Sequence, residues 1–255
     1  NTVLDARGIN NGTATGTTIV DGKYGKGRSF NGTSDYITLP SGFSDFTKGI
    51  TVSVWAKPMS ASNYSRFIEF GETPNDSNAS IVLYRKGTTN TLVWEVGDGS
   101  AHPSLEVENG IINNEWHLYT GTVNETGEGR VYRDGMLLGE GQLVIPANVL
   151  RTYNYIGKSN YAWDSLYQGD MDEIKVYNTV VSSEKILYDF LEGVGEGNSI
   201  SQNVSNLTIN ELNTIENGLV SYWTMDEDSG NTVLDARGIN NGTATGTTIV
   251  DGKYG

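Results

Sequence analysis

The chain contains no cysteine, which excludes disulfide bridges, thiol catalysis and zinc sites built from cysteine. Its two histidines, His102 and His117, are too few for a histidine-rich metal centre. No run of about 18 apolar residues occurs, so the sequence predicts no membrane-spanning helix. Basic residues are also scarce: 17 Lys and Arg stand against 31 Asp and Glu, giving a net charge of −14. This balance argues against nucleic acid or anionic membranes as partners and is compatible with Ca²⁺ or neutral polysaccharide.

The residues that are present favour an all-β domain. The 255 residues suffice for a sizeable core, and 32 glycines with 10% aromatic residues suit many strands joined by turns. Asp134-Gly135 predicts a tight hairpin, and Ser182 or Ser183 caps one convincing helix that ends at Gly193. Apolar and polar residues alternate along five segments that we expect to be strands: 50–56, 91–96, 116–123, 130–133 and 172–177.

One string of residues occurs twice, at 1–25 and again at 231–255, without a mismatch. The offset of 231 − 1 = 230 residues is the size of a domain, so the copy indicates one period of a tandem array plus an overlap. A cloning artefact is the alternative. Residues 194–217 are rich in Gly, Asn and Ser and lack aromatic residues, which indicates a linker between repeats. A predicted strand, 218–225, and an acidic turn follow this linker.

Six segments carry a family resemblance, and they follow in family order once the chain is read from Gly218. They are GLVSYWTMDEDSGNTVLDARGINNGT, GKYGKGRSFNGTSDYITLP, ITVSVWAKP, NEWHLYTGTV, GRVYRDGMLLG and GDMDEIKVYNTVVSSEKILYDF. Together they resemble the laminin-G-like, concanavalin-A-like jelly-roll family over 218–255 followed by 26–193. The resemblance implies an all-β, two-sheet antiparallel jelly-roll sandwich with one short C-terminal helix, a fold that serves many functions.

The resemblance gives the repeated ends a structural meaning. We expect a jelly-roll domain over 1–193 that lacks its first strand, a linker over 194–217, and the opening strand and loop of the next repeat over 218–255. Strand 218–225 either folds back onto its own domain or completes the next one, in cis or in trans. The second arrangement is favoured because both copies of the duplicated string then have a place. The residues expected in this inter-repeat strand are Gly218, Leu219, Val220, Tyr222 and Trp223.

Catalytic patterns are absent from the sequence. Glucanases share this fold, and their signature resembles Glu-x-Asp-x-x-Glu on one strand. Asp170, Asp172 and Glu173 come closest, with a different spacing. The resemblance makes His117 a structural strand residue, and His102 lies in a polar loop. We therefore expect no enzymatic activity.

Calcium is the favoured cofactor, because acidic loops supply the oxygen ligands that it needs. The resemblance implies a structural calcium site near the closing strand. This chain departs from the family pattern, since Ala6 and Arg7 replace a small polar pair. A solvated acidic turn is the alternative. The candidate ligands are Asp5, Asn10, Asp172, Asp226, Asp235 and Asn240.

Aromatic residues in one loop, 159–170, are candidates for stacking on sugar rings: Tyr161, Trp163 and Tyr167, with Tyr64 as a further candidate. The alternative is that Trp163 packs over the sandwich edge or against the next repeat. Glycosylation is predicted at nine Asn-x-Ser/Thr triplets, although a turn-rich surface alone also favours such triplets. They begin at Asn11, Asn31, Asn63, Asn75, Asn78, Asn124, Asn203, Asn206 and Asn241.

The sequence therefore predicts an extracellular, cell-surface location, and the lack of disulfides favours a prokaryotic surface. The expected role is a structural or adhesive repeat unit of a surface fibre, with identical repeats or subunits joined head to tail as a homopolymer. A Ca²⁺-dependent, carbohydrate-binding, lectin-like module is the alternative, with glycans as partners.

Overall fold

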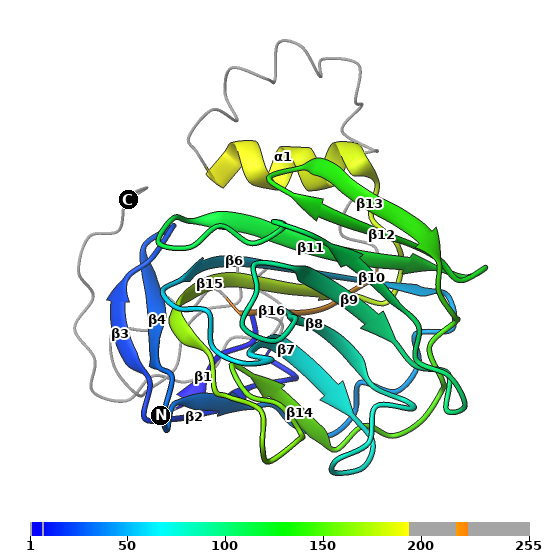
Figure 1. The fold of residues 1–255 in the computed structure, drawn as a ribbon, viewed down its shortest axis with the longest axis horizontal. Coiled ribbons are helices and arrows are strands. Elements are labelled where there is room, and N and C mark those ends of the chain that lie inside the picture. Colours follow the sequence, from blue (N-terminus) through cyan, green and yellow to red (C-terminus); the bar gives the residue numbers. More distant parts are fainter. Residues whose placement is uncertain (1, 7, 194–217, 224–255) are drawn as a thin grey trace.

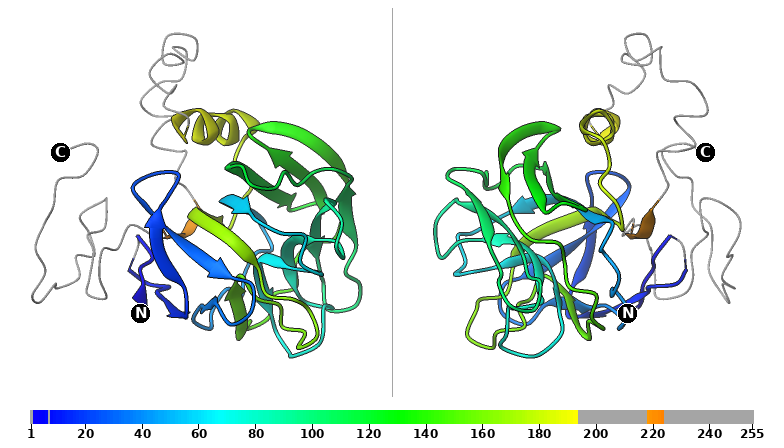
Figure 2. Two further views of the ribbon diagram at one scale, coloured as in Figure 1. Left: turned by 60° about the vertical axis from the view of Figure 1, so that its left-hand side comes forward. Right: turned by 90° about the vertical axis from the view of Figure 1, so that its right-hand side faces the viewer.

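Two antiparallel sheets form a sandwich in the computed structural model, which describes residues 2–6, 8–193 and 218–223 (Figures 1 and 2). Sheet I has the order β1 (Thr2–Val3), β2 (Gly12–Thr15), β5 (Tyr36–Thr38), β14 (Tyr153–Ile156), β7 (Arg66–Gly71), β8 (Ile81–Arg85), β9 (Leu92–Val96) and β10 (Ser104–Val107). Sheet II has the order β13 (Met136–Gln142), β12 (Glu128–Arg133), β11 (His117–Asn124), β6 (Gly49–Pro58), β15 (Gln168–Tyr177), β4 (Lys26–Asn31) and β3 (Thr18–Asp21). Strand β16 (Leu219–Trp223) also pairs with β15. The predicted two-sheet antiparallel jelly roll is therefore confirmed.

The core lies between the sheets and follows the alternation read from the sequence. Along β6, Ile50, Val52, Val54 and Ala56 are fully buried and belong to the main core cluster. The Trp94 indole crosses between the sheets, because its Nε1 donates to the Thr122 carbonyl at 3.0 Å. Its ring lies where a Cβ on Gly121 would be, 2.5 Å from the nearest ring atom, so only glycine fits there.

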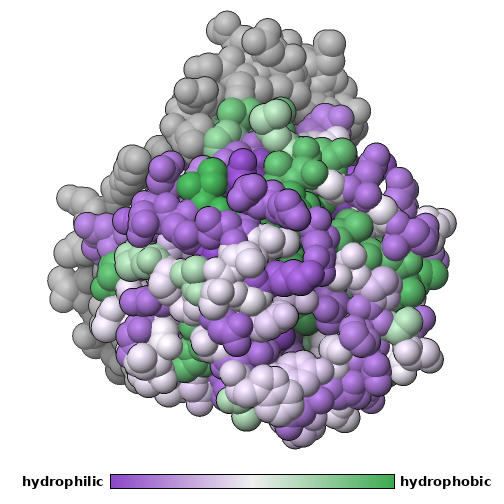
Figure 3. All heavy atoms as spheres, viewed as in Figure 1, coloured by the Kyte–Doolittle hydropathy of each residue, from purple (hydrophilic) through white to green (hydrophobic). Residues whose placement is uncertain are grey.

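The predicted turn and helix are both present. Asp134 and Gly135 have φ values of 56° and 77°, the left-handed pair that a two-residue hairpin requires. Ser182 Oγ accepts the backbone N–H of Lys185 at 3.2 Å and so caps α1 (Ser183–Gly193). Phe190 of α1 stacks on Trp55 with ring centroids 5.8 Å apart, which places the helix against the outer face of sheet II. Figure 3 shows apolar side chains gathered over β13 and α1, where Met136, Leu137 and Leu187 are exposed.

Strand β16 occupies a defined slot beside β15. One edge of β15 pairs with β6, while the other pairs with β4 over residues 168–171 and with β16 over residues 174–177. A bulge at Glu173, with φ of 49°, separates the two halves. Val220 packs against the main core, and the Tyr222 hydroxyl donates to Glu173. Without β16, the backbone groups of this half of β15 would lose their partners.

The strand therefore folds back onto its own domain in this structure, which is the less favoured of the two arrangements expected from the sequence. Its backbone is also held by residues near the start of the chain. Tyr222 N donates to Asp5 Oδ1 at 2.8 Å, and Asn10 Nδ2 donates to the Val220 carbonyl at 3.4 Å. The linker, residues 194–217, and the second copy, 231–255, lie outside the described residues. The assignment of 218–255 to a next repeat stays a prediction.

Candidate functional site

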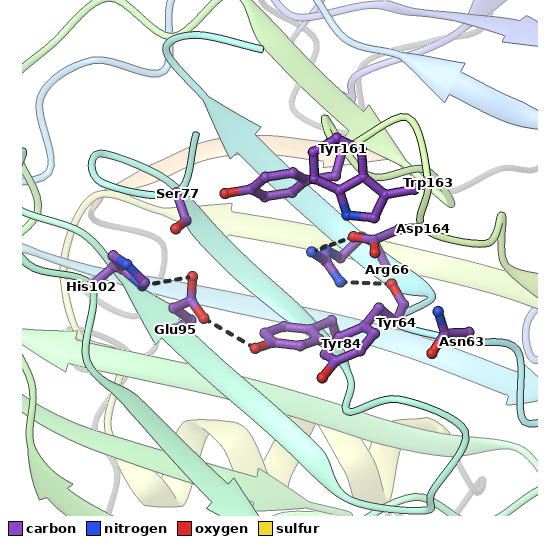
Figure 4. A pocket seen from close by; sticks show the side chains of 10 residues that line it. All are labelled: Asn63, Tyr64, Arg66, Ser77, Tyr84, Glu95, His102, Tyr161, Trp163 and Asp164. Carbon is purple, nitrogen blue, oxygen red and sulfur yellow. Dashed lines mark hydrogen bonds and ion pairs between the residues drawn. The ribbon is translucent and has the colours of Figure 1, made fainter. Parts of the chain in front are cut away.

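A pocket of about 290 Å³ lies on the outer face of sheet I, over β7, β8 and β9 (Figure 4). Strand alternation places it there: Leu83 and Trp94 point into the core, so Tyr84 and Glu95 point outward. The loop between β14 and β15 supplies the opposite wall. The pocket is lined by Asn63, Tyr64, Arg66, Ser77, Tyr84, Glu95, His102, Tyr161, Trp163 and Asp164.

A buried ion cluster around Arg66 forms the floor of the pocket. The guanidinium Nε lies 2.9 Å from Glu69 Oε2, and Nη2 lies 2.9 Å from Asp164 Oδ2. Its planar group also stacks over the Tyr84 ring, 4.3 Å from the centroid. Burial raises the pKa of the Glu69 carboxyl, and the Arg66 charge opposes that rise. The Arg66 guanidinium at the floor of the pocket is therefore held by two carboxylates and one aromatic ring.

A third carboxylate, Glu95, stands beside this cluster. Its Oε2 accepts the Tyr84 hydroxyl at 3.0 Å, and its Oε1 lies 3.6 Å from His102 Nδ1. Burial raises the pKa of Glu95, while the Tyr84 hydrogen bond and His102 act in the opposite direction. Glu95 therefore presents a desolvated acceptor at the pocket surface.

The rim of the pocket carries the aromatic side chains. Trp163 is 69% exposed, and its ring centroid lies 5.1 Å from that of Tyr161. The loop that carries them is fixed at both ends. Ser159 Oγ donates to Asp164 Oδ2 at 2.8 Å, and Asn160 Nδ2 donates to the carbonyls of Thr73 and Asp76 at 3.1 and 3.0 Å. The exposed indole therefore stands on an ordered support.

Of the predicted sugar-stacking residues, the structure brings Tyr161, Trp163 and Tyr64 to one pocket. The prediction that Tyr167 stacks on a sugar is corrected, because its side chain is 2% exposed and belongs to the core. Its ring packs edge-on against Phe30, with centroids 5.8 Å apart, and its hydroxyl donates to the Asp170 carbonyl at 3.1 Å. The chain has already turned inward at this residue, ahead of β15.

Sequence reasoning missed Arg66, Tyr84 and Glu95, and it noted His102 only as a loop residue. Alternation could have found the outward direction of Tyr84 and Glu95 on their strands. Their grouping depends on β7, β8 and β9 being neighbours in sheet I, which no local pattern reveals.

Two of the candidate calcium ligands, Asp5 and Asp172, accept hydrogen bonds from backbone N–H groups, and the third described candidate, Asn10, donates through Nδ2 to the Val220 carbonyl. Asp5 Oδ2 accepts from Ile9 and Asn10, and Asp172 Oδ2 accepts from Tyr24 at 2.8 Å. No group of three or more acidic or histidine side chains in the described residues is arranged to hold a metal ion. Three further candidates lie outside the described residues: Asp226, Asp235 and Asn240. Calcium stays a prediction.

Five of the predicted glycosylation sites are exposed: Asn11, Asn31, Asn63, Asn75 and Asn78. Asn124 is half-buried, and its Nδ2 donates to Glu128 at 3.1 Å. Asn203, Asn206 and Asn241 fall outside the described residues. Glycosylation stays a prediction.

His117 is tied to a structural role, since its Nδ1 lies 2.6 Å from Asp134 Oδ2 at the turn between β12 and β13. The expected lack of enzymatic activity stays a prediction. Within the described residues, no helix has the length and apolar character that crossing a membrane requires.

Comparison with known proteins gives a family and a group of related folds. The family model for the concanavalin A-like lectin/glucanase superfamily matches residues 31–187. Domain 4 of AbnA, an extracellular arabinanase from Geobacillus stearothermophilus solved with arabinotriose, gives a TM-score of 0.58 at 23% identity, covering 70% of this chain and 87% of that one. No curated protein sequence matches the chain.

Two other solved structures share the fold. The binding domain of botulinum neurotoxin serotype G gives a TM-score of 0.57 at 16% identity, covering 75% of this chain and 51% of that one. The CBM40 of a Ruminococcus gnavus sialidase, bound to α2,3-sialyllactose, gives a TM-score of 0.51 at 11% identity, covering 64% of this chain and 96% of that one. At these identities the likeness concerns the fold alone.

Proposed function

Because this chain belongs to the concanavalin A-like lectin/glucanase superfamily, we propose that it is a carbohydrate-binding, lectin-like module that uses the pocket on sheet I. One observation carries the proposal: Trp163 stands 69% exposed beside Tyr161 above a floor of ordered polar groups. A large indole left in water on a fixed loop favours a ligand that covers it.

The chemistry of a sugar suits this arrangement. One face of a pyranose or furanose ring consists of C–H groups that pack on an indole or phenol ring, while its hydroxyls form hydrogen bonds at the edge. Trp163 and Tyr161 offer the apolar surface. Glu95 and Ser77 offer acceptors elsewhere in the same pocket, and Asp164 offers another beside Trp163 on the same loop (Figure 4).

The related folds support a glycan ligand and an extracellular location for this chain. The arabinanase domain was solved with arabinotriose and belongs to an extracellular enzyme, and the CBM40 was solved with sialyllactose. Neither sugar is assigned to this chain, because fold alone does not determine the ligand.

The test compares two variants in a glycan array followed by calorimetry on the best ligand. We expect Trp163→Ala to weaken binding at least about tenfold, because it removes the stacking surface. Met136→Ala is the matched control, since Met136 is also 69% exposed but lies on β13, away from the pocket. Equal affinity of the Trp163 variant and the native protein would contradict the assigned site, and no binding to any glycan would contradict the function.

A second function, a structural or adhesive repeat unit of an extracellular surface fibre, is favoured by the duplication of the two residues that hold β16. We propose that identical units join head to tail, with strand 218–225 of one unit completing the next. The support is that β16 is held by Asp5 and Asn10, and both residues recur in the second copy as Asp235 and Asn240. A strand from another unit therefore carries its own replacements for both partners.

Paired alanine variants of the full chain distinguish the two arrangements. Exchange of β16 between units predicts that Asp235→Ala lowers the Tm and that the native protein forms oligomers of increasing size. Closure within one chain predicts that Asp5→Ala alone lowers the Tm, because Asp5 Oδ1 accepts Tyr222 N, and that the protein is monomeric. Size-exclusion chromatography with light scattering measures the size, and a monomer at all concentrations would contradict the fibre.

A further inference from the structure

The charge of the pocket points to the class of sugar that it accepts. Among the ten residues of the described chain that line it, Arg66 is the only lysine or arginine. Its guanidinium is already held between Glu69 and Asp164, at 2.9 Å from each, and its Nη1 donates to the Tyr64 carbonyl at 2.6 Å. One positive charge therefore faces two carboxylates before any ligand arrives.

The remaining groups make the pocket more negative. Glu95 adds a third carboxylate, against which the Tyr84 hydroxyl and the more distant His102 ring lie, and the Arg66 charge acts on it as well. Asp164 lines the pocket too, and its Oδ2 accepts from Ser159 Oγ at 2.8 Å and lies 2.9 Å from Arg66 Nη2. The whole chain, at −14, adds a repulsive field of the same sign.

We infer that the pocket selects glycans without negative charge, either neutral sugars or amino sugars, and rejects carboxylated ones. This inference rests on the proposed carbohydrate site. Sugar hydroxyls and amino groups are hydrogen-bond donors, and the pocket supplies acceptors in Glu95 and Asp164. A ligand carboxylate would instead approach these groups in a partly desolvated site, where like charges repel strongly.

The experiment uses the full native chain. A glycan array of neutral, amino and carboxylated sugars identifies the binders, and calorimetry then compares the best ligand with its carboxylated counterpart, such as lactose with sialyllactose or xylotriose with its glucuronic acid derivative. We expect the carboxylated partner to bind at least about tenfold more weakly. Equal or tighter binding of carboxylated sugars would overturn the charge selection and leave the carbohydrate site standing. No binding to any sugar would overturn both.

A gain-of-function variant provides an independent test. Asp164→Asn can still accept from Ser159 but no longer neutralises Arg66, so we expect the affinity for the carboxylated sugar to rise several-fold relative to its neutral counterpart. Glu128→Gln is the matched control. It makes the same change in net charge on β12, where the Glu128 side chain is 48% exposed, and should leave the ratio unchanged.

If Asp164→Asn fails to fold, Glu95→Gln removes the other lining carboxylate and carries the same expectation. A ratio that stays constant in the folded variants would overturn the inference.

Discussion

At the scale of single residues, Arg66 determines the character of the candidate site. It is almost completely buried, yet it lines a surface pocket, where Glu69, Asp164 and the Tyr84 ring contact its guanidinium. The Arg66 charge is therefore paired with Glu69 and Asp164 at the floor of the pocket. The exposed Trp163 and the acceptors of Glu95 and Asp164 are the groups left to meet a ligand.

Replacing Tyr167 tests its position in the core. We expect Tyr167→Ala to lower the free energy of unfolding by about 3–5 kcal/mol, since it opens a cavity beside Phe30 and Phe67. Urea denaturation measures this loss. Glycan affinity of the folded variant should equal that of the native protein. A stable variant that no longer binds glycans would instead restore Tyr167 as a stacking residue.

The buried carboxyl of Glu95 makes stability depend on pH in a defined direction. Burial raises its pKa in the folded protein, so its contribution is fully favourable below the unfolded pKa of about 4.3 and is lost as pH rises through the folded pKa. Glu95→Gln cannot titrate. We therefore expect the Tm of this variant, minus that of the native protein, to increase from pH 4 to pH 7. Scanning calorimetry at both pH values measures this, and a constant difference would contradict it.

At the scale of elements, strands were predictable and loop ends were not. Period-two alternation predicted 50–56 and 172–177, and the structure has β6 and β15 there, because the outward and inward faces of these strands differ in polarity. The aromatic loop was recognised as a unit, but nothing in its composition marks the residue at which it turns inward. Tyr167 was misplaced for this reason.

The predicted calcium site is tested by metal removal. If the six candidate ligands Asp5, Asn10, Asp172, Asp226, Asp235 and Asn240 hold Ca²⁺, chelation removes an ion that binds only the folded state, and we expect EDTA to lower the Tm. Thermal denaturation with EDTA, and again after adding excess Ca²⁺, measures the effect. An unchanged Tm would contradict the calcium site.

At the scale of the whole molecule, the family and the sandwich followed from the order of six weak motifs, and the family match and the two sheets confirm both. The pocket was only partly predictable. Trp163 and Tyr161 are adjacent in sequence, whereas Arg66, Tyr84 and Glu95 meet only through the order of strands in sheet I. The slot for β16 was anticipated, and the structure fills it from the same chain.

The most direct test of the carbohydrate site is a crystal structure of the full chain with its best array ligand. We expect a sugar ring packed on the Trp163 indole, with ligand hydroxyls hydrogen-bonded to Glu95 or Asp164. A sugar bound elsewhere, with the Trp163 face left uncovered, would contradict the account.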